Sequence, residues 1–245
     1  MEKMDKLEAL LEFGIALLKK REINYWLDCG TLLGIIRDKK LLSWEKDIDI
    51  GVLREEINES DIDYIVTKAK EHGCEVNIYD FVISIVKNDY VLDFKMYRKK
   101  GDILFEEKLT PKNLIGSAIG FFVHSYSSKY STSRKGLNSL NTLIIRIIQF
   151  SSKLMPNFLA LQLVKPLKYL YKNFLTIDSS EAVPFSLLNE LEQLDFLGKS
   201  YNVPKKTEEY LVFRFGQDWK VPKKDWITAR DDGGYLLNKN TFYHE

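Results

Sequence analysis

The hydrophobic positions of the first hundred residues switch between helical and strand spacing. Apolar residues recur every three or four positions through residues 4–21, which predicts a helix. Carboxylate and aliphatic residues alternate over 47–52, the period-two pattern of a strand. A second helix is expected over 62–72, and further strands are expected at 25–29, 75–79, 81–87 and 90–96. Helices combined with several strands predict an α/β or α+β sheet domain.

The pattern changes after residue 101. Residues 117–175 are rich in Ser, Lys, Asn and Leu and have a helical pattern. Beyond them we expect a helix over 186–194, a hairpin that turns at Gly198, a helix over 207–215 with Thr207 as its N-cap, and loop from 219. The chain is therefore divided into three parts: a core (1–107), a basic helical insertion for the acceptor (108–180), and a C-terminal helical segment that completes the domain (181–245).

Two carboxylates carry the candidate chemistry. Asp47 and Asp49 are two positions apart on a predicted strand, so both side chains leave the same face, while Ile48 and Ile50 point into the core. Paired carboxylates repel each other unless a cation neutralises them, and oxygen ligands suit Mg²⁺, with Mn²⁺ as an alternative. Asp93 lies in a later predicted strand. If the two strands are neighbours, three carboxylates converge on one or two metal ions.

A Gly-Thr step precedes these carboxylates. Gly30 and Thr31 follow a predicted strand and open a short helix, where free N–H groups and a hydroxyl would contact a phosphate. Arg37, six residues later, could clamp the same phosphate, and Trp44 could stack on a base or sugar. Each feature alone is more often structural: a surface carboxylate, an ordinary cap, a solvated charge, a core aromatic. Their order along the chain favours a functional site.

These residues resemble the hallmark of a known family. The segment YWLDCGTLLGIIRDKKLLSWEKDIDIG is similar to the strand, Gly-Thr-Leu-Leu-Gly, Arg, Trp and Asp-x-Asp order of the LicD family, which includes the fukutin-related proteins. The order of the Gly-Thr step, a helix, the Asp-x-Asp strand and a later strand with Asp93 also resembles the wider nucleotidyltransferase (polymerase-beta-like) superfamily. One departure is the run Trp44-Glu45-Lys46-Asp47, where the family often has consecutive acids. The resemblance covers about residues 1–100 and 185–230.

The resemblance implies an α+β nucleotidyltransferase fold, a mixed sheet flanked by helices, with the basic helical insertion added. It further implies a LicD-like phosphotransferase that moves phosphocholine, ribitol phosphate or glycerol phosphate from a CDP-linked donor to a glycan or lipid-linked glycan of the lipopolysaccharide or capsule. Asp47, Asp49 and Asp93 would be the catalytic and metal-binding residues. Gly30, Thr31 and Arg37 would hold the donor phosphates. Which alcohol and which sugar take part stays open.

Two other functions fit the same residues. A nucleotidyltransferase would use the same metal site to move a nucleotide from a nucleoside triphosphate, and it would release pyrophosphate instead of CMP. A glycan- or membrane-binding protein with a decayed site is the third reading. Nothing in the sequence indicates nucleic acid as a partner.

The charges are unevenly spread although they nearly cancel, at 36 basic and 35 acidic residues. No Asp or Glu occurs from Lys108 to Leu175, a stretch with ten basic residues. Residues 163–175 predict an amphipathic helix that starts near Pro166, with Lys165, Lys168 and Lys172 on one face. Together with the apolar run 143–150, this helix either binds a membrane surface or packs on the core. Packing is the favoured reading, and both can hold together.

Composition also bears on the compartment. The chain has two cysteines without a CxxC pair, which favours a reducing compartment over a disulfide framework. Its charged N-terminus lacks a signal-peptide pattern, and it contains no apolar stretch long enough to span a membrane. We therefore expect a cytoplasmic protein, peripheral at the inner face of the membrane where the basic helix makes contact.

Overall fold

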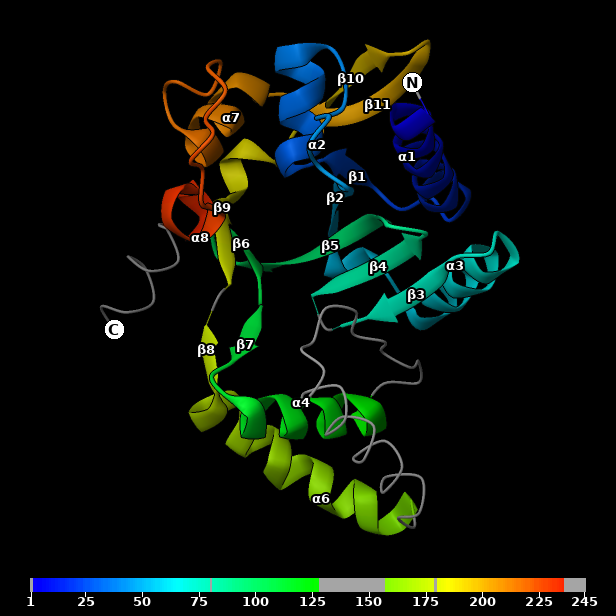
Figure 1. Ribbon diagram of the computed structural model, residues 1–245, viewed down its shortest axis with the longest axis vertical. Coiled ribbons are helices and arrows are strands. Elements are labelled where there is room, and N and C mark those ends of the chain that lie inside the picture. The colour runs from blue at the N-terminus through cyan, green and yellow to red at the C-terminus, as the bar shows by residue number, and fades with distance from the viewer. Residues whose placement is uncertain (1, 80, 128–156, 179, 236–245) are drawn as a thin grey trace. The chain divides into compact units, whose positions relative to one another are not determined.

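The computed structural model describes residues 2–79, 81–127, 157–178 and 180–235. The chain forms two compact units. The core unit contains residues 1–76, 80–107 and 180–245, and the basic unit contains residues 77–79 and 108–179. Figure 1 colours both along the chain.

The core unit is built from strands and helices that follow the predicted order closely up to residue 100. Its helices and helical turns are α1 (Glu2–Lys20), α2 (Cys29–Leu33), η1 (Gly34–Asp38), η2 (Arg54–Glu56), α3 (Glu59–Glu71), η4 (Phe185–Leu187), α7 (Thr207–Phe215) and α8 (Thr228–Asp231). The strands that form its sheets are β1 (Tyr25–Leu27), β2 (Asp47–Leu53), β3 (Glu75–Ile78), β4 (Val82–Lys87), β5 (Tyr90–Lys100), β6 (Ile103–Glu106), β9 (Glu181–Pro184), β10 (Leu191–Phe196) and β11 (Lys199–Pro204).

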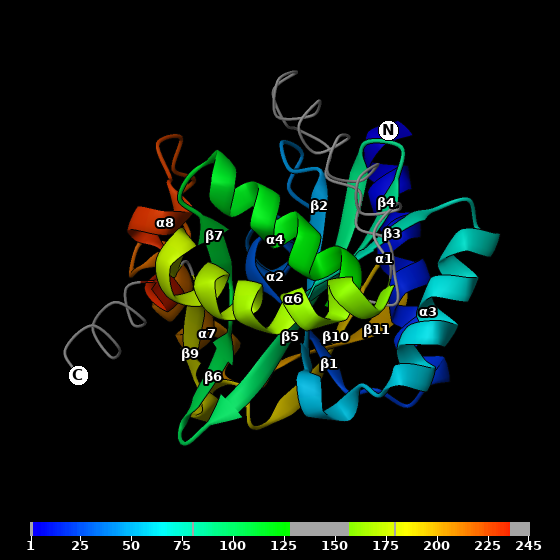
Figure 2. The same ribbon diagram turned by 90° about the horizontal axis from the view of Figure 1, so that it is seen from below.

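Seven strands form one mixed sheet in the order β1-β2-β5-β4-β3, with β6 paired to both β5 and β9. β2 and β5 run parallel, whereas β1 with β2, β4 with β5, β5 with β6 and β6 with β9 are antiparallel. The ring of Phe13 on α1 lies 4.5 Å from that of His72, the residue that directly follows α3; both helices are labelled in Figures 1 and 2. The predicted α+β fold, a mixed sheet flanked by helices, is confirmed.

The two faces of β2 and β5 differ in chemistry. Ile48, Ile50, Leu92 and Phe94 are all at most 1% exposed and form the apolar face. Helix α1 packs there so closely that a Cβ on Gly14 would lie 2.4 Å from Leu92. Because side chains alternate along a strand, the odd-numbered residues from 47 and from 91 leave the opposite face. That face holds the predicted carboxylates.

The C-terminal part of the core unit departs from the prediction. The helix expected over 186–194 is wrong: η4 and then strand β10 occupy these residues. β10 pairs with β11 from Leu191 opposite Pro204 to Phe196 opposite Lys199. The predicted hairpin turn is confirmed, and Leu197 and Gly198 both have positive φ there. Leucines spaced by three and four fit a helix equally well, so pairing with β11 decides the outcome.

The described part of the basic unit contains a pair of helices and a two-stranded antiparallel ribbon. Its elements are β7 (Leu109–Pro111), α4 (Leu114–Ser127), α6 (Asn157–Leu170), η3 (Tyr171–Leu175) and β8 (Thr176–Asp178), with β7 antiparallel to β8. Helices α4 and α6 pack against each other (Figure 2). The prediction that a helix starts near Pro166 is wrong, because α6 begins at Asn157 and contains that proline. The apolar run 143–150 lies outside the described residues.

Candidate active site

Two neighbouring parallel strands bring the predicted carboxylates to one face of the sheet. Asp49 on β2 stands opposite Asp93 on β5, so the predicted adjacency of the two strands is confirmed. Both side chains are half-buried, and Asp47, two residues earlier on the same face, is exposed. On the other side of β5, Ser84 of β4 stands opposite Asp93. The site therefore combines one exposed and two partly buried carboxylates.

This carboxylate group carries unfavourable electrostatics. Burial raises the pKa of Asp49 well above its usual range, and the charges of Asp93, Asp28 and Asp47 raise it further, while Lys95 lowers it. Because the folded-state pKa is raised, the fold is least stable with Asp49 ionised, and stability falls as the pH rises through that pKa. A cation bound between these side chains would remove the repulsion.

The carboxylate oxygens of Asp47, Asp49 and Asp93 are the type of ligand that Mg²⁺ prefers, but these side chains do not form a complete metal site by themselves. Within the residues that the structure describes, no group of three or more His, Cys, Asp or Glu side chains is placed to hold a metal ion. Asp47, Asp49 and Asp93 thus do not converge as a complete three-ligand site. Mg²⁺ is commonly held by one or two carboxylates together with substrate phosphates and water. The oxygen-only set on β2 and β5 fits that mode.

The Gly-Thr turn is built differently from the prediction. Helix α2 begins at Cys29, and its N-cap is Asp28, whose carboxylate accepts a hydrogen bond from the Cys29 N–H. Gly30 and Thr31 are inside the helix, so their predicted capping role is wrong. The Thr31 hydroxyl, 3% exposed, accepts the backbone N–H of Asp49 at 2.9 Å. This hydrogen bond ties α2 to β2 at Asp49. Contact between Thr31 and a donor phosphate stays a prediction.

Asp28 is fully buried and is held by tyrosines from distant parts of the chain. The Tyr97 hydroxyl on β5 donates to Oδ2 at 2.8 Å, and the Tyr210 hydroxyl on α7 donates to Oδ1. A buried carboxylate needs such donors to offset its lost hydration. The start of α2 is therefore fixed by both the sheet and the C-terminal helix.

Glu45, which the sequence analysis noted only as a departure from the family pattern, lies at the turn. A Cβ on Gly30 would come within 2.4 Å of Glu45 Oε2, so the carboxylate lies directly on that glycine. Burial, together with the charge of Asp47, raises the pKa of Glu45 to about 7, although Arg37 acts to lower it. The carboxyl group of Glu45 thus occupies the space over Gly30 where a donor phosphate was predicted.

Arg37 and Trp44 lie close to each other. The Arg37 guanidinium makes two hydrogen bonds to the carboxylate of Asp38, at 2.8 and 2.9 Å, and lies 6.0 Å from the centre of the Trp44 ring. The Trp44 side chain is 62% exposed, which excludes the core reading of this residue. Its exposed ring leaves stacking on a base or sugar as a prediction. Arg37 would have to share or leave Asp38 to hold a phosphate.

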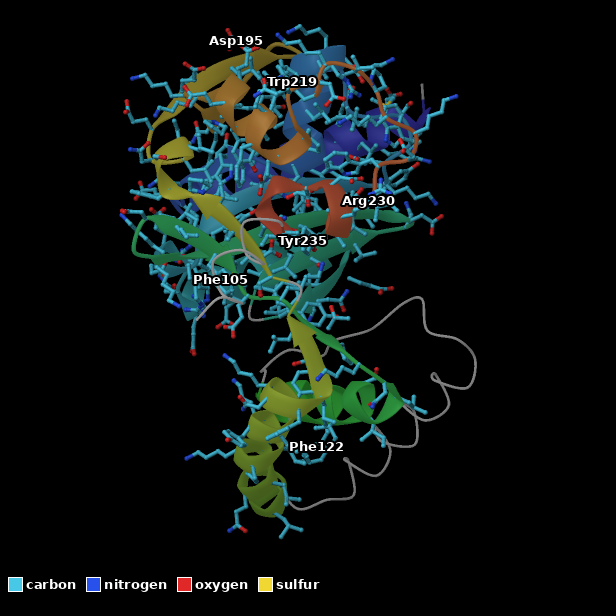
Figure 3. The ribbon with its side chains drawn as sticks, turned by 90° about the vertical axis from the view of Figure 1, so that its left-hand side faces the viewer. Phe105, Phe122, Asp195, Trp219, Arg230 and Tyr235 are labelled. Carbon is cyan, nitrogen blue, oxygen red and sulfur yellow. The ribbon has the colours of Figure 1, made fainter. Side chains whose placement is uncertain are left out.

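A buried ion network lies behind α2, and the sequence analysis did not find it. Arg214 on α7 contacts Glu181 at 2.7 Å and Asp232 at 3.0 Å, and its Nη2 lies 2.8 Å from the Cys29 sulfur. Lys95 on β5 contacts the same Glu181 carboxylate at 2.9 Å. Tyr235, the last described residue, is labelled in Figure 3. The network joins β5, β9, α7 and the first residue of α2.

The mixed sheet thus carries Asp49 and Asp93 on adjacent parallel strands, and Thr31 of the Gly-Thr turn is hydrogen-bonded to the first of these strands. A comparison with known families agrees with this arrangement. Residues 22–113 match the family model for the nucleotidyltransferase domain of LicD/FKTN/FKRP. Residues 22–113 are therefore similar to the LicD family, and the resemblance predicted from the sequence is confirmed for this part of the chain.

Similar proteins cover only part of the chain. It is 29% identical over 89 residues to an uncharacterized protein of Rickettsia prowazekii (strain Madrid E), which is 36% of this chain and 32% of that protein. It is 30% identical over 86 residues to an uncharacterized protein of Rickettsia typhi (strain ATCC VR-144 / Wilmington), 35% of this chain and 26% of that protein. The chain thus aligns with about a third or less of these curated relatives.

Two solved structures of the antibiotic-resistance factor ANT(2'')-Ia align with part of this chain. The solution structure is 12% identical with a TM-score of 0.33, over 69% of this chain and 92% of that chain. The crystal structure in complex with adenylyl-2''-tobramycin is 11% identical with a TM-score of 0.30, over 67% and 95%.

Proposed function

We propose that this chain is a Mg²⁺-dependent phosphotransferase that moves a phospho-alcohol group from a CDP-linked donor to a hydroxyl of a cell-surface glycan. The observation that carries the proposal is the register of β2 and β5, which sets Asp49 opposite Asp93 with Asp47 on the same face. The family match supports a transferase of this kind. The alcohol is phosphocholine, ribitol phosphate or glycerol phosphate.

Each residue has a role that follows from its position. Asp47 and Asp49 would hold Mg²⁺, which supplies positive charge next to the donor pyrophosphate when it is bound. Asp93, half-buried beside them, would accept the proton of the acceptor hydroxyl as its oxygen attacks the phosphorus that bears the alcohol. The phosphoanhydride bond then breaks and CMP leaves. Gly30 and Arg37 would hold the donor phosphates once Glu45 and Asp38 give way.

We propose a cytoplasmic setting for this reaction, with CDP-linked donor and glycan acceptor as partners. Cys29 and Cys74 are both free and buried, which suits a reducing compartment. None of the helices in the described part of the chain is long and apolar enough to cross a membrane.

A thermal-shift screen tests the proposal directly. CDP-choline, CDP-ribitol, CDP-glycerol, CTP and UTP are each added with and without Mg²⁺. A ligand at about 100 times its Kd stabilises the fold by about 2.7 kcal/mol, a rise of about 5–11 °C for a chain of this size. We expect that rise with one CDP-alcohol and Mg²⁺ together, and release of CMP when an acceptor is added.

The variants Asp47→Asn and Asp49→Asn should abolish both the Mg²⁺-dependent shift and turnover while the protein still melts cooperatively. Asp195→Asn, an exposed carboxylate on β10 (Figure 3), is the matched control and should behave as the parent does. A shift with triphosphates alone, with release of pyrophosphate, would replace the proposal by nucleotidyl transfer. No shift with any of the five compounds would leave a glycan- or membrane-binding protein.

A further inference from the structure

Helix α6 and the helical turn η3 that follows it present three distinct faces, and one of these faces packs on α4 within the described residues. Tyr171, which directly follows α6, is 5% exposed. Its ring packs so closely on Gly120 of α4 that a Cβ added to this glycine would lie 2.5 Å from the ring. The backbone oxygen of Leu175 approaches Gly116 in the same way, at 2.7 Å. Two glycines spaced by four on α4 therefore form the surface against which this face packs.

A second face is apolar yet exposed. Leu159, Leu163, Leu170 and Phe174 are 41%, 40%, 39% and 58% exposed. Their spacing of four, seven and four places them on one side of a helix. Tyr169, 66% exposed, borders this stripe and meets the ring of Phe174 edge-on. Six of the ten exposed large hydrophobic residues in the described chain belong to the basic unit, so the exposure is concentrated there.

The third face is basic. Lys165, Lys168 and Lys172 are exposed and spaced by three and four, on the side of the helix opposite the apolar stripe. The surrounding sequence adds to their charge, because ten basic and no acidic residues occur from 108 to 175. Within the described residues, the apolar stripe and the lysines thus lie on opposite exposed sides of one helix.

From these three faces we infer that α6 docks in the plane of an anionic lipid surface. We define the lipid stripe as Leu159, Leu163, Tyr169, Leu170 and Phe174, which enters the boundary between headgroups and acyl chains. The lysine face stays in the aqueous headgroup layer, as in amphipathic helices that lie on membranes.

Charge and length favour a lipid surface over other partners. A second copy of the chain would bring the same acid-free, basic segment against this one, and like charges oppose such contact. Nucleic acid would attract the lysines but would leave the lipid stripe exposed to water. None of the described helices is long and apolar enough to cross a membrane. A helix with one apolar side and one basic side suits contact in the plane of a lipid surface. The inference stands independently of the reaction proposed above.

Vesicle co-sedimentation of the full chain tests the inference. The vesicles are phosphatidylcholine alone or phosphatidylcholine with phosphatidylserine, at low and at high salt. We expect binding to the anionic vesicles that weakens with salt. The triple variant Leu163→Gln, Leu170→Gln, Phe174→Gln should lose about tenfold in affinity, equal to about 1.4 kcal/mol.

The matched control replaces three exposed apolar residues of the core unit. Leu197, Val221 and Ile227 are 57%, 61% and 52% exposed, and their replacement by Gln should leave vesicle binding unchanged. Replacing Lys165, Lys168 and Lys172 by Gln should weaken binding to anionic vesicles only. Equal losses in the stripe variant and in the control would overturn the inference, as would the absence of binding by the parent. Light scattering that shows a dimer abolished by the stripe variant would assign this face to a second copy instead.

Discussion

Replacement of Arg214 by Met tests whether the buried ion network holds the site together. The guanidinium is 1% exposed and contacts Glu181 and Asp232, so Met would leave these two buried carboxylates with Lys95 as the nearby cation. Breaking a buried ion pair by removing one partner destabilises a protein by about 3–5 kcal/mol. For a chain of this length that lowers Tm by about 6–20 °C.

An exposed ion pair of the same length provides the control. Lys205 and Glu190 are 2.7 Å apart, as Arg214 and Glu181 are, but both side chains are 59% exposed. Water and salt screen such a pair, so Lys205→Met should leave Tm unchanged within error. Calorimetry gives the Tm of both variants and of the parent at one pH and salt concentration. The two losses in Tm then compare a buried with an exposed ion pair of the same length.

The dependence of the free energy of unfolding on pH, measured at acidic pH, provides a second test of the ion network. Burial alone would raise the pKa of Glu181, but Lys95 and Arg214 outweigh it and hold this pKa well below its usual range. A lowered pKa contributes stability that is fully present above the unfolded value of about 4.3 and is lost as the pH falls through the folded value. The stability gap between the parent and Glu181→Gln should therefore narrow in acid. If Arg214→Met melted within about 3 °C of the parent, the network argument would be refuted.

Two further substitutions test the packing of β2 and the role of Glu45. Gly51→Ala places a Cβ 2.1 Å from the ring of Trp26, so overpacking should destabilise the protein by about 1–3 kcal/mol, measured by denaturant unfolding; an unchanged midpoint would contradict the close packing. Glu45→Ala removes the carboxylate from Gly30 and should tighten donor binding by about tenfold, or about 1.4 kcal/mol, measured by calorimetric titration with Mg²⁺; weaker binding would show that Glu45 assists the donor instead.

The sheet was predictable because its strands carry their signal locally. Alternation over 47–52 and the apolar spacing of 4–21 each report a face that is buried, and β2 and α1 follow them. The turn at Gly198 was equally local, since two successive residues with positive φ need a residue such as glycine. The segment 186–194 failed because its pattern has two solutions, and a partner strand chooses between them.

The candidate site was predictable in its residues but not in its contacts. The sequence places Asp47 and Asp49 on one face of a strand, and the register with β5 then brings Asp93 opposite Asp49. Nothing local shows that the Glu45 side chain turns back onto Gly30, because this depends on how the segment between them folds. The local sequence also makes Thr31 look like a cap, although its hydroxyl is used by β2.

The family match ends at residue 113, yet the start of α2 depends on residues beyond it. Tyr210 donates to Asp28, the N-cap of that helix, and Arg214 contacts the sulfur of Cys29, its first residue. Cys29 has a φ of 43°, a left-handed conformation that is unfavourable for this residue type and persists only when surrounding contacts enforce it. Residues 180–235 supply part of that enforcement. The segment that resembles the family therefore carries the carboxylates. The C-terminal segment helps to hold the start of α2, the helix that contains Gly30 and Thr31.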